Sequence, residues 1–196
     1  IGLVMPLPES SPRKHVHTRT ITYKGYERED GLWDMEAHMT DTKTYTFSND
    51  WRGEMQAGEP LHEMLLRVTI DDDFIIQNVI AVTDNSPFEM CPEIAPNYKS
   101  LIGIQMGPGW RKAIRMQVGG IQGCTHLTEL LFPMATVAMQ TIWPLSRKRK
   151  RKEREGEAEK RQSRRPLILD TCHAWASDSQ VVKQNTPKYY TGKDKD

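Results

Sequence analysis

The alternation of apolar and polar side chains over residues 33–39 constrains the fold more than any other feature. Trp33, Met35, Ala37 and Met39 fall in one phase, and acidic and His residues fall between them. Successive side chains of a strand point to opposite faces. The pattern therefore predicts a strand with one buried and one solvated face.

Other segments supply partners for this strand. Residues 15–23 are rich in β-branched side chains and predict a strand. Residues 61–70 and 74–83 predict a hairpin, because the acidic run at 71–73 tolerates turn geometry. Residues 42–47 predict a further short strand.

Helical patterns follow the strands. We expect short helices over residues 95–103 and 110–118, and a long helix over residues 125–142, where apolar residues recur at helical spacing. This order predicts an α+β fold, in which an antiparallel sheet is covered on one side by helices. The strands are mostly N-terminal and the helices mostly C-terminal.

Composition predicts five regions along the chain. Residues 1–14 form a loose N-terminal arm, and residues 15–145 form a single α+β domain. Residues 146–165 are a highly charged basic linker or solvated helix. Residues 166–190 are a tail that returns to the domain, and residues 191–196 are a frayed terminus.

The basic segment Arg147–Arg165 holds eleven Lys or Arg residues and four Glu residues. No aromatic residue interleaves with them, so stacking on nucleic acid bases has no platform. We expect weak contact with nucleic acid at most, since the formal net charge of the chain is only +1. In the tail beyond it, Val181-Val182 predicts one further short strand.

Composition also bounds the compartment. No run approaches the roughly 20 apolar residues that span a bilayer, so no membrane association is expected. Ile1–Pro8 is too short and too rich in proline for the apolar region of a secretion signal. Three cysteines without tight spacing argue against a disulfide framework. We therefore predict a cytoplasmic protein.

Cys124 is the strongest candidate for chemistry. It follows the glycine-rich segment 119–123 and stands where the long helix is predicted to begin. A cysteine there meets free N–H groups and the positive end of the helix dipole, which favour the thiolate. His126 lies two residues further on and would point elsewhere in a regular helix, but within a frayed first turn both side chains could face one site.

The two remaining cysteines complete a possible donor set. Cys91 lies in a loop stiffened by prolines, and Cys172 precedes His173. Together Cys91, Cys124, Cys172, His126 and His173 would suit zinc or an iron–sulfur cluster. The chain has no C-x-x-C pair, so only folding could gather these residues.

Three further histidines fall on predicted strands. His17, His38 and His62 could line one polar face together with Asp34 and Glu36. A solvated sheet face is the commoner explanation of such a pattern.

Four segments carry a resemblance: Arg28–Trp33, Gly58–Met64, Pro87–Cys91 and, above all, Gly123–Leu131. They resemble a bacterial family catalogued as a domain of unknown function, over roughly residues 15–142. The tail around Cys172 is also similar to that family. The layout of strands, helices and separated cysteines is similar to the U-type iron–sulfur scaffold proteins, which is an analogy of layout only.

Three functions remain open from the sequence. The first is an accessory protein that binds a metal or an iron–sulfur cluster through Cys and His ligands. The second is a non-catalytic module that binds a small molecule or another protein. The third is an enzyme with Cys124 as nucleophile and a nearby His as base.

Overall fold

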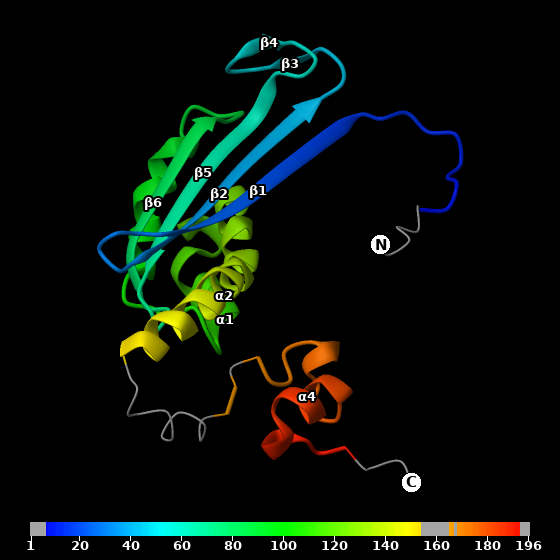
Figure 1. Cartoon of the computed structure of the whole chain (residues 1–196). Coiled ribbons are helices and arrows are strands. Elements are labelled where there is room, and N and C mark those ends of the chain that lie inside the picture. Colours follow the sequence, from blue (N-terminus) through cyan, green and yellow to red (C-terminus); the bar gives the residue numbers. More distant parts are fainter. Residues whose placement is uncertain (1–6, 154–164, 167, 193–196) are drawn as a thin grey trace. The chain divides into compact units, whose positions relative to one another are not determined.

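Four long strands form an antiparallel sheet in the order β1-β2-β5-β6 (Figure 1). Their bounds are His17–Glu27 for β1, Trp33–Lys43 for β2, Pro60–Ile70 for β5 and Ile76–Asn85 for β6. The short strands β3 (Phe47–Asn49) and β4 (Gly53–Met55) pair as a separate hairpin. This computed structural model describes residues 7–153, 165–166 and 168–192.

The alternation in β2 divides the sheet into a covered and an open face. Trp33, Met35, Ala37 and Met39 are each at most 1% exposed. The register pairs Met39 with Met64 of β5. The buried apolar residues of β5 are Met64, Leu66, Val68 and Ile70. Because both strands present the same phase to the same side, their apolar side chains form one core layer.

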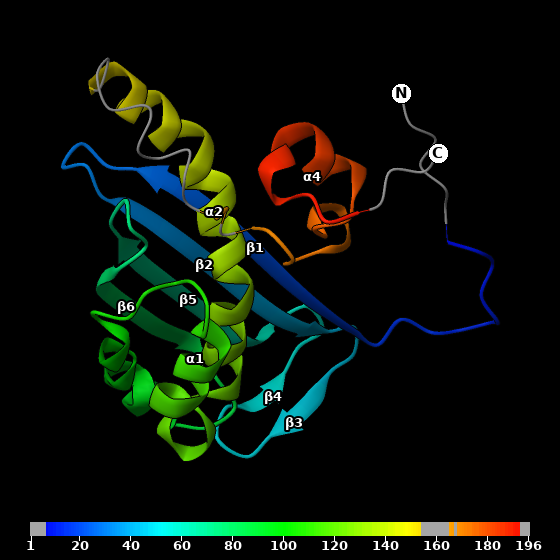
Figure 2. The same cartoon turned by 90° about the horizontal axis from the view of Figure 1, so that it is seen from below.

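Helices cover this apolar face (Figure 2). The chain forms the 3₁₀ helix η1 (Cys91–Leu101), α1 (Trp110–Val118), the short η2 (Gly120–Gln122) and the long α2 (Thr125–Glu153). Six residues of the predicted apolar stripe of α2 are buried: Leu127, Leu130, Leu131, Met134, Ala138 and Ile142. The seventh, Ala135, is partly buried and packs against the core. The α+β architecture predicted from the sequence is confirmed.

A close contact sets how α2 lies on the sheet. A Cβ atom at Gly25 of β1 would lie 2.0 Å from Thr141 Oγ1 of α2. Further along the same strand, the Tyr23 hydroxyl donates a hydrogen bond to the Leu130 carbonyl of α2. The helix therefore packs directly on the backbone of β1.

The structure corrects two predicted elements in this part of the chain. Residues 42–47 are not one strand, because β2 runs to Lys43 and β3 begins only at Phe47. The helix expected over residues 95–103 is a 3₁₀ helix that begins earlier, at Cys91, and contains Pro96.

The chain divides into two compact units, Ile1–Trp143 and Pro144–Asp196. In the second unit, η3 (His173–Trp175), α4 (Gln180–Asn185) and η4 (Pro187–Tyr189) are short helices. The strand predicted at Val181-Val182 is wrong, since both residues lie in α4. Ser179 Oγ accepts a hydrogen bond from the Val182 N–H and so favours a helix start there.

Parts of the predicted terminal and basic regions lie outside the described residues. These are residues 1–6, 154–164, 167 and 193–196. Within the basic segment, α2 continues to Glu153. None of the helices in the described ranges is both long and apolar enough to cross a membrane.

Candidate metal centre

A buried acid lies at the end of β2. Asp41 continues the phase of Trp33–Met39, so it points to the covered face, and it is 3% exposed. The register places Arg19 of β1 opposite Asp41. His62 precedes Met64 by two residues in β5 and therefore lies on the same face. Three strands thus bring charged and imidazole side chains to one end of the core.

The start of α2 adds a residue from the other layer. The Thr128 N–H donates to the Cys124 carbonyl at 2.9 Å, which makes Cys124 the N-cap residue. The Tyr98 hydroxyl donates to the same carbonyl at 2.9 Å and accepts from the Cys124 N–H at 3.0 Å. A Cβ atom at Gly123 would lie 2.2 Å from the Val118 carbonyl oxygen, so only glycine fits this turn. The first turn of α2 is thereby fixed, with His126 facing the sheet.

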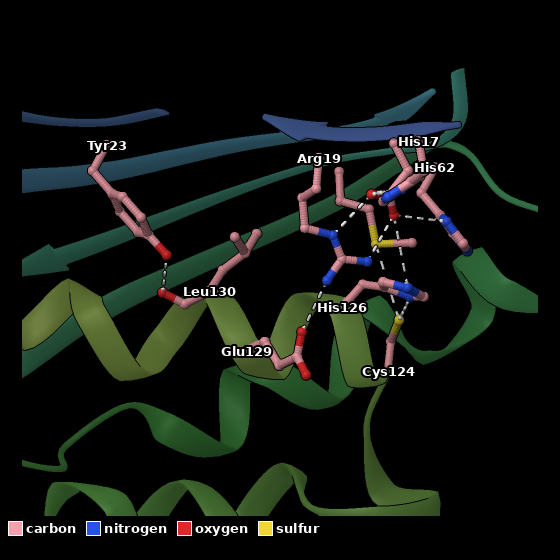
Figure 3. A network of polar contacts seen from close by, with 10 residues as sticks. His17, Arg19, Tyr23, His62, Cys124, His126, Glu129 and Leu130 are labelled. Carbon is pink, nitrogen blue, oxygen red and sulfur yellow. Dashed lines mark hydrogen bonds and ion pairs between the residues drawn. The ribbon is translucent and has the colours of Figure 1, made fainter. Parts of the chain in front are cut away.

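Asp41 is the centre of the resulting network. Figure 3 labels the residues that surround its carboxylate, His17, Arg19, His62 and His126. Its Oδ1 accepts from Arg19 Nε at 2.8 Å and lies 3.0 Å from His17 Nε2. Its Oδ2 accepts from Arg19 Nη2 at 2.7 Å and lies 3.1 Å from His62 Nδ1. The distance from Oδ2 to His126 Nε2 is 4.0 Å, which is beyond a hydrogen bond.

The Arg19 guanidinium joins the two layers. Its Nη1 donates to Glu129 Oε2 of α2 at 3.1 Å, while the rest of the fork holds Asp41. Burial by itself raises the pKa of the Asp41 carboxyl. The hydrogen bonds and charge of Arg19, together with the His17 hydrogen bond, outweigh burial and lower that pKa to about 2. Asp41 is therefore ionised throughout the physiological range.

His62 and His126 stack against each other, with ring centroids 3.8 Å apart. Burial lowers the pKa of His62, and the nearby charge of a protonated His126 would lower it further. Burial also lowers the pKa of His126, followed by the charge of Arg19. Both rings are consequently held in the neutral form, which is the form that ligates metals.

Asp41, His62 and His126 can each offer one ligand atom, and these atoms lie within 4.8 Å of one another. Among the residues that the structure describes, they are the one group of three or more His, Cys, Asp or Glu residues arranged in this way. Ligands of one tetrahedral ion, at bond lengths near 2.1 Å, lie about 3.4 Å apart. His62 and Asp41 are already about this close, at 3.1 Å, whereas His126 Nε2 is 4.0 Å from Asp41 Oδ2 and would have to move toward them.

The structure brings together two of the five residues predicted as ligands. Cys124 Sγ lies 3.9 Å from His126 Nδ1, on the side of the ring away from Asp41. Cys91, at the start of η1, is not part of the group around Asp41. Cys172 and His173 belong to the second unit, where Cys172 is exposed and His173 begins η3.

The three strand histidines do not share a face. His38 lies on the open face, where its Nε2 is 3.0 Å from Glu63 Oε1. His17 and His62 lie on the covered face with Asp41. The polar face expected for all three is therefore wrong for His17 and His62.

Fold and site together define an α+β protein with a two-His, one-Asp cluster where the sheet meets its longest helix. Residues 17–140 match the family described as "Protein of unknown function (DUF2889)", and the chain belongs to this family. The resemblance noted in the sequence is thus confirmed at the level of the family. A search of curated proteins and a search of solved structures each found no match.

Proposed function

We propose that this chain is a metal-binding protein that holds one divalent transition metal ion through Asp41, His62 and His126. The proposal is carried by one observation, the convergence of a carboxylate and two imidazoles within 4.8 Å. Two nitrogen donors and one oxygen donor suit zinc and neighbouring metals of intermediate softness.

The protonation states support this assignment. The lowered pKa of Asp41 leaves its carboxylate charged, and the lowered pKa values of His62 and His126 leave the rings neutral. A metal therefore displaces few protons near pH 7. The ion must share Asp41 with Arg19, which moderates its affinity. Three protein ligands leave a fourth position open, as in catalytic zinc sites.

The sequence alone left open whether Cys and His ligands hold zinc or an iron–sulfur cluster, and the donors around Asp41 favour one of these. The group around Asp41 contains no thiolate, which favours a mononuclear ion over an iron–sulfur cluster. Cys124 fits the role of outer-shell partner, because a metal-bound imidazole commonly donates its second N–H to a neighbouring group. Cys91, Cys172 and His173 remain sequence-based proposals.

Zinc titration of the purified, metal-free chain against a chromophoric chelator tests the proposal. We expect one equivalent to bind. The Asp41→Asn and His62→Gln substitutions should each weaken binding by more than the roughly 10- to 100-fold that loss of an outer-shell partner costs. His38→Gln is the matched control, since His38 also pairs with a carboxylate but lies on the open face. Equal affinity in Asp41→Asn and His38→Gln would show that the ion binds elsewhere.

A second candidate is a cysteine nucleophile. Cys124 Sγ faces His126 Nδ1 at 3.9 Å, and His126 Nε2 faces Asp41 Oδ2 at 4.0 Å, which is the order of nucleophile, base and orienting acid. In this role Cys124 would react with iodoacetamide faster than Cys172, which is exposed. Mass spectrometry of the alkylated peptides measures both rates. This candidate would be removed if Cys124 reacts more slowly than Cys172 and if His126→Gln does not change the rate at Cys124.

Cys124→Ser separates the two functions. The substitution removes the thiol nucleophile. It should weaken zinc binding by no more than about 10- to 100-fold, which is the usual cost of losing an outer-shell partner.

A further inference from the structure

A second set of possible ligands lies on the other side of the His126 ring. Cys124 Sγ is 3.9 Å from His126 Nδ1 and also 3.9 Å from Met64 Sδ. Met64 comes from β5 and Cys124 from the start of α2, so sheet and helix each supply a sulfur. Thiolate and thioether sulfurs are the donors that copper(I) prefers.

We propose that Met64, Cys124 and His126 form a site for a soft monovalent metal ion, copper(I). This site goes beyond the divalent site of the proposed function and shares only one metal ligand, His126, with it. The imidazole presents Nε2 to Asp41 and Nδ1 to Cys124, so the two nitrogens face two different donor sets.

The distances from Cys124 Sγ to its two neighbours suit trigonal coordination. With metal–sulfur and metal–nitrogen bonds of about 2.3 and 2.0 Å, trigonal geometry separates two sulfurs by about 4.0 Å. It separates a sulfur from a nitrogen by about 3.7 Å. The two separations measured from Cys124 Sγ are both 3.9 Å, within a few tenths of an ångström of these values.

Burial and charge favour a monovalent over a divalent ion here. Met64 is 0% exposed and belongs to the hydrophobic core, and Cys124 packs against that core. Binding replaces the thiol proton, which goes to solvent, so one thiolate and one copper(I) give a neutral complex. A divalent ion would leave an unpaired positive charge beside the core, which is costly in a low-dielectric environment.

The test is an anaerobic titration of the full, reduced chain with copper(I) against a chromophoric copper(I) chelator. We expect Cys124→Ser and Met64→Leu to weaken binding, Cys124→Ser by more than the roughly 10- to 100-fold cost of an outer-shell partner. Met106→Leu and Cys172→Ser are the matched controls and should bind as the unmutated chain does. Met106 is also buried, and Cys172 is exposed.

Two further measurements keep the two sites apart. Asp41→Asn should weaken zinc binding, whereas Met64→Leu should weaken copper(I) binding and leave zinc affinity unchanged, so one proposal can fail without the other. X-ray absorption of the unmutated, copper-loaded chain should show two sulfur and one nitrogen neighbours, and it needs no variant to fold. Unchanged copper(I) affinity in Met64→Leu, or a spectrum with a single sulfur, would overturn the site.

Discussion

Replacing Asp41 with Asn should destabilise the metal-free protein strongly at neutral pH. The substitution keeps the shape of the side chain but removes the charge that Arg19 holds through two hydrogen bonds of 2.8 and 2.7 Å. It also gives the Arg19 guanidinium, whose side chain is 33% exposed, a neutral amide oxygen in place of one of its two carboxylate partners. Loss of one partner of a buried pair is costly because the other charge stays desolvated.

The lowered pKa of Asp41 gives the size of the effect. A carboxyl with a pKa of 3.8 in the unfolded chain and about 2 in the folded chain contributes about 2 kcal/mol. Because the folded pKa is the lower one, this contribution is fully present above about pH 4. It is lost as the pH falls through about 2.

Urea denaturation followed by circular dichroism, with a chelator present, measures the effect at pH 7, 4 and 2.5. We expect Asp41→Asn to be about 2 kcal/mol less stable than the unmutated chain at pH 7, and the difference to shrink at pH 2.5. Asp30→Asn is the control, because Asp30 also pairs with an arginine but is exposed, and it should change stability far less. The reasoning would be refuted if Asp41→Asn loses no more unfolding free energy at pH 7 than Asp30→Asn does. It would also be refuted if the loss in Asp41→Asn is the same at pH 2.5 as at pH 7.

Three more outcomes can be measured by the same denaturation assay. Gly25→Ala should cost about 1–3 kcal/mol by overpacking against α2, and Thr141→Ala in the same chain should restore part of that loss. Tyr98→Phe should cost about 1–3 kcal/mol, because the Cys124 N–H and carbonyl that cap α2 lose a partner. His62 and His126 have lowered pKa values in the folded chain, so protons bind the unfolded chain more readily. The free energy of unfolding should therefore be unaffected by these two residues above about pH 6.5 and should fall as the pH drops below it. A His62→Gln, His126→Gln double variant should lose that part of the pH dependence, and a variant that keeps it would contradict the assignment.

The architecture was predictable because local patterns and tertiary burial agree. Apolar residues recur at every second position over residues 33–39 and at helical spacing along α2. In both elements the structure buries the face that carries these apolar residues. Residues 110–118 form α1 with the predicted bounds. The predictions failed where signals were short. Val181-Val182 has strand propensity, but the N-cap at Ser179 starts a helix instead.

The candidate site was only half predictable. Cys124 and His126 were found because the glycines before them indicate a helix start. Asp41 was missed and His62 was assigned to a polar sheet face, although a usable signal exists: each is a polar residue that falls in the buried phase of its strand. A polar side chain in that phase needs partners, and Arg19 in the same phase of β1 supplies one. What the sequence could not show is that α2 begins above this end of the sheet, since that depends on how the layers pack.

Because His126 lies on the first turn of α2, an ion held by Asp41, His62 and His126 would link the helix to the sheet. Asp41 and His62 come from the sheet, so any motion that lifts the amino end of the helix also breaks the donor set. By thermodynamic linkage, an ion that binds only the closed arrangement must suppress that opening. Local unfolding and release then become a single event, and amide hydrogen exchange at the head of α2 would report directly on occupancy.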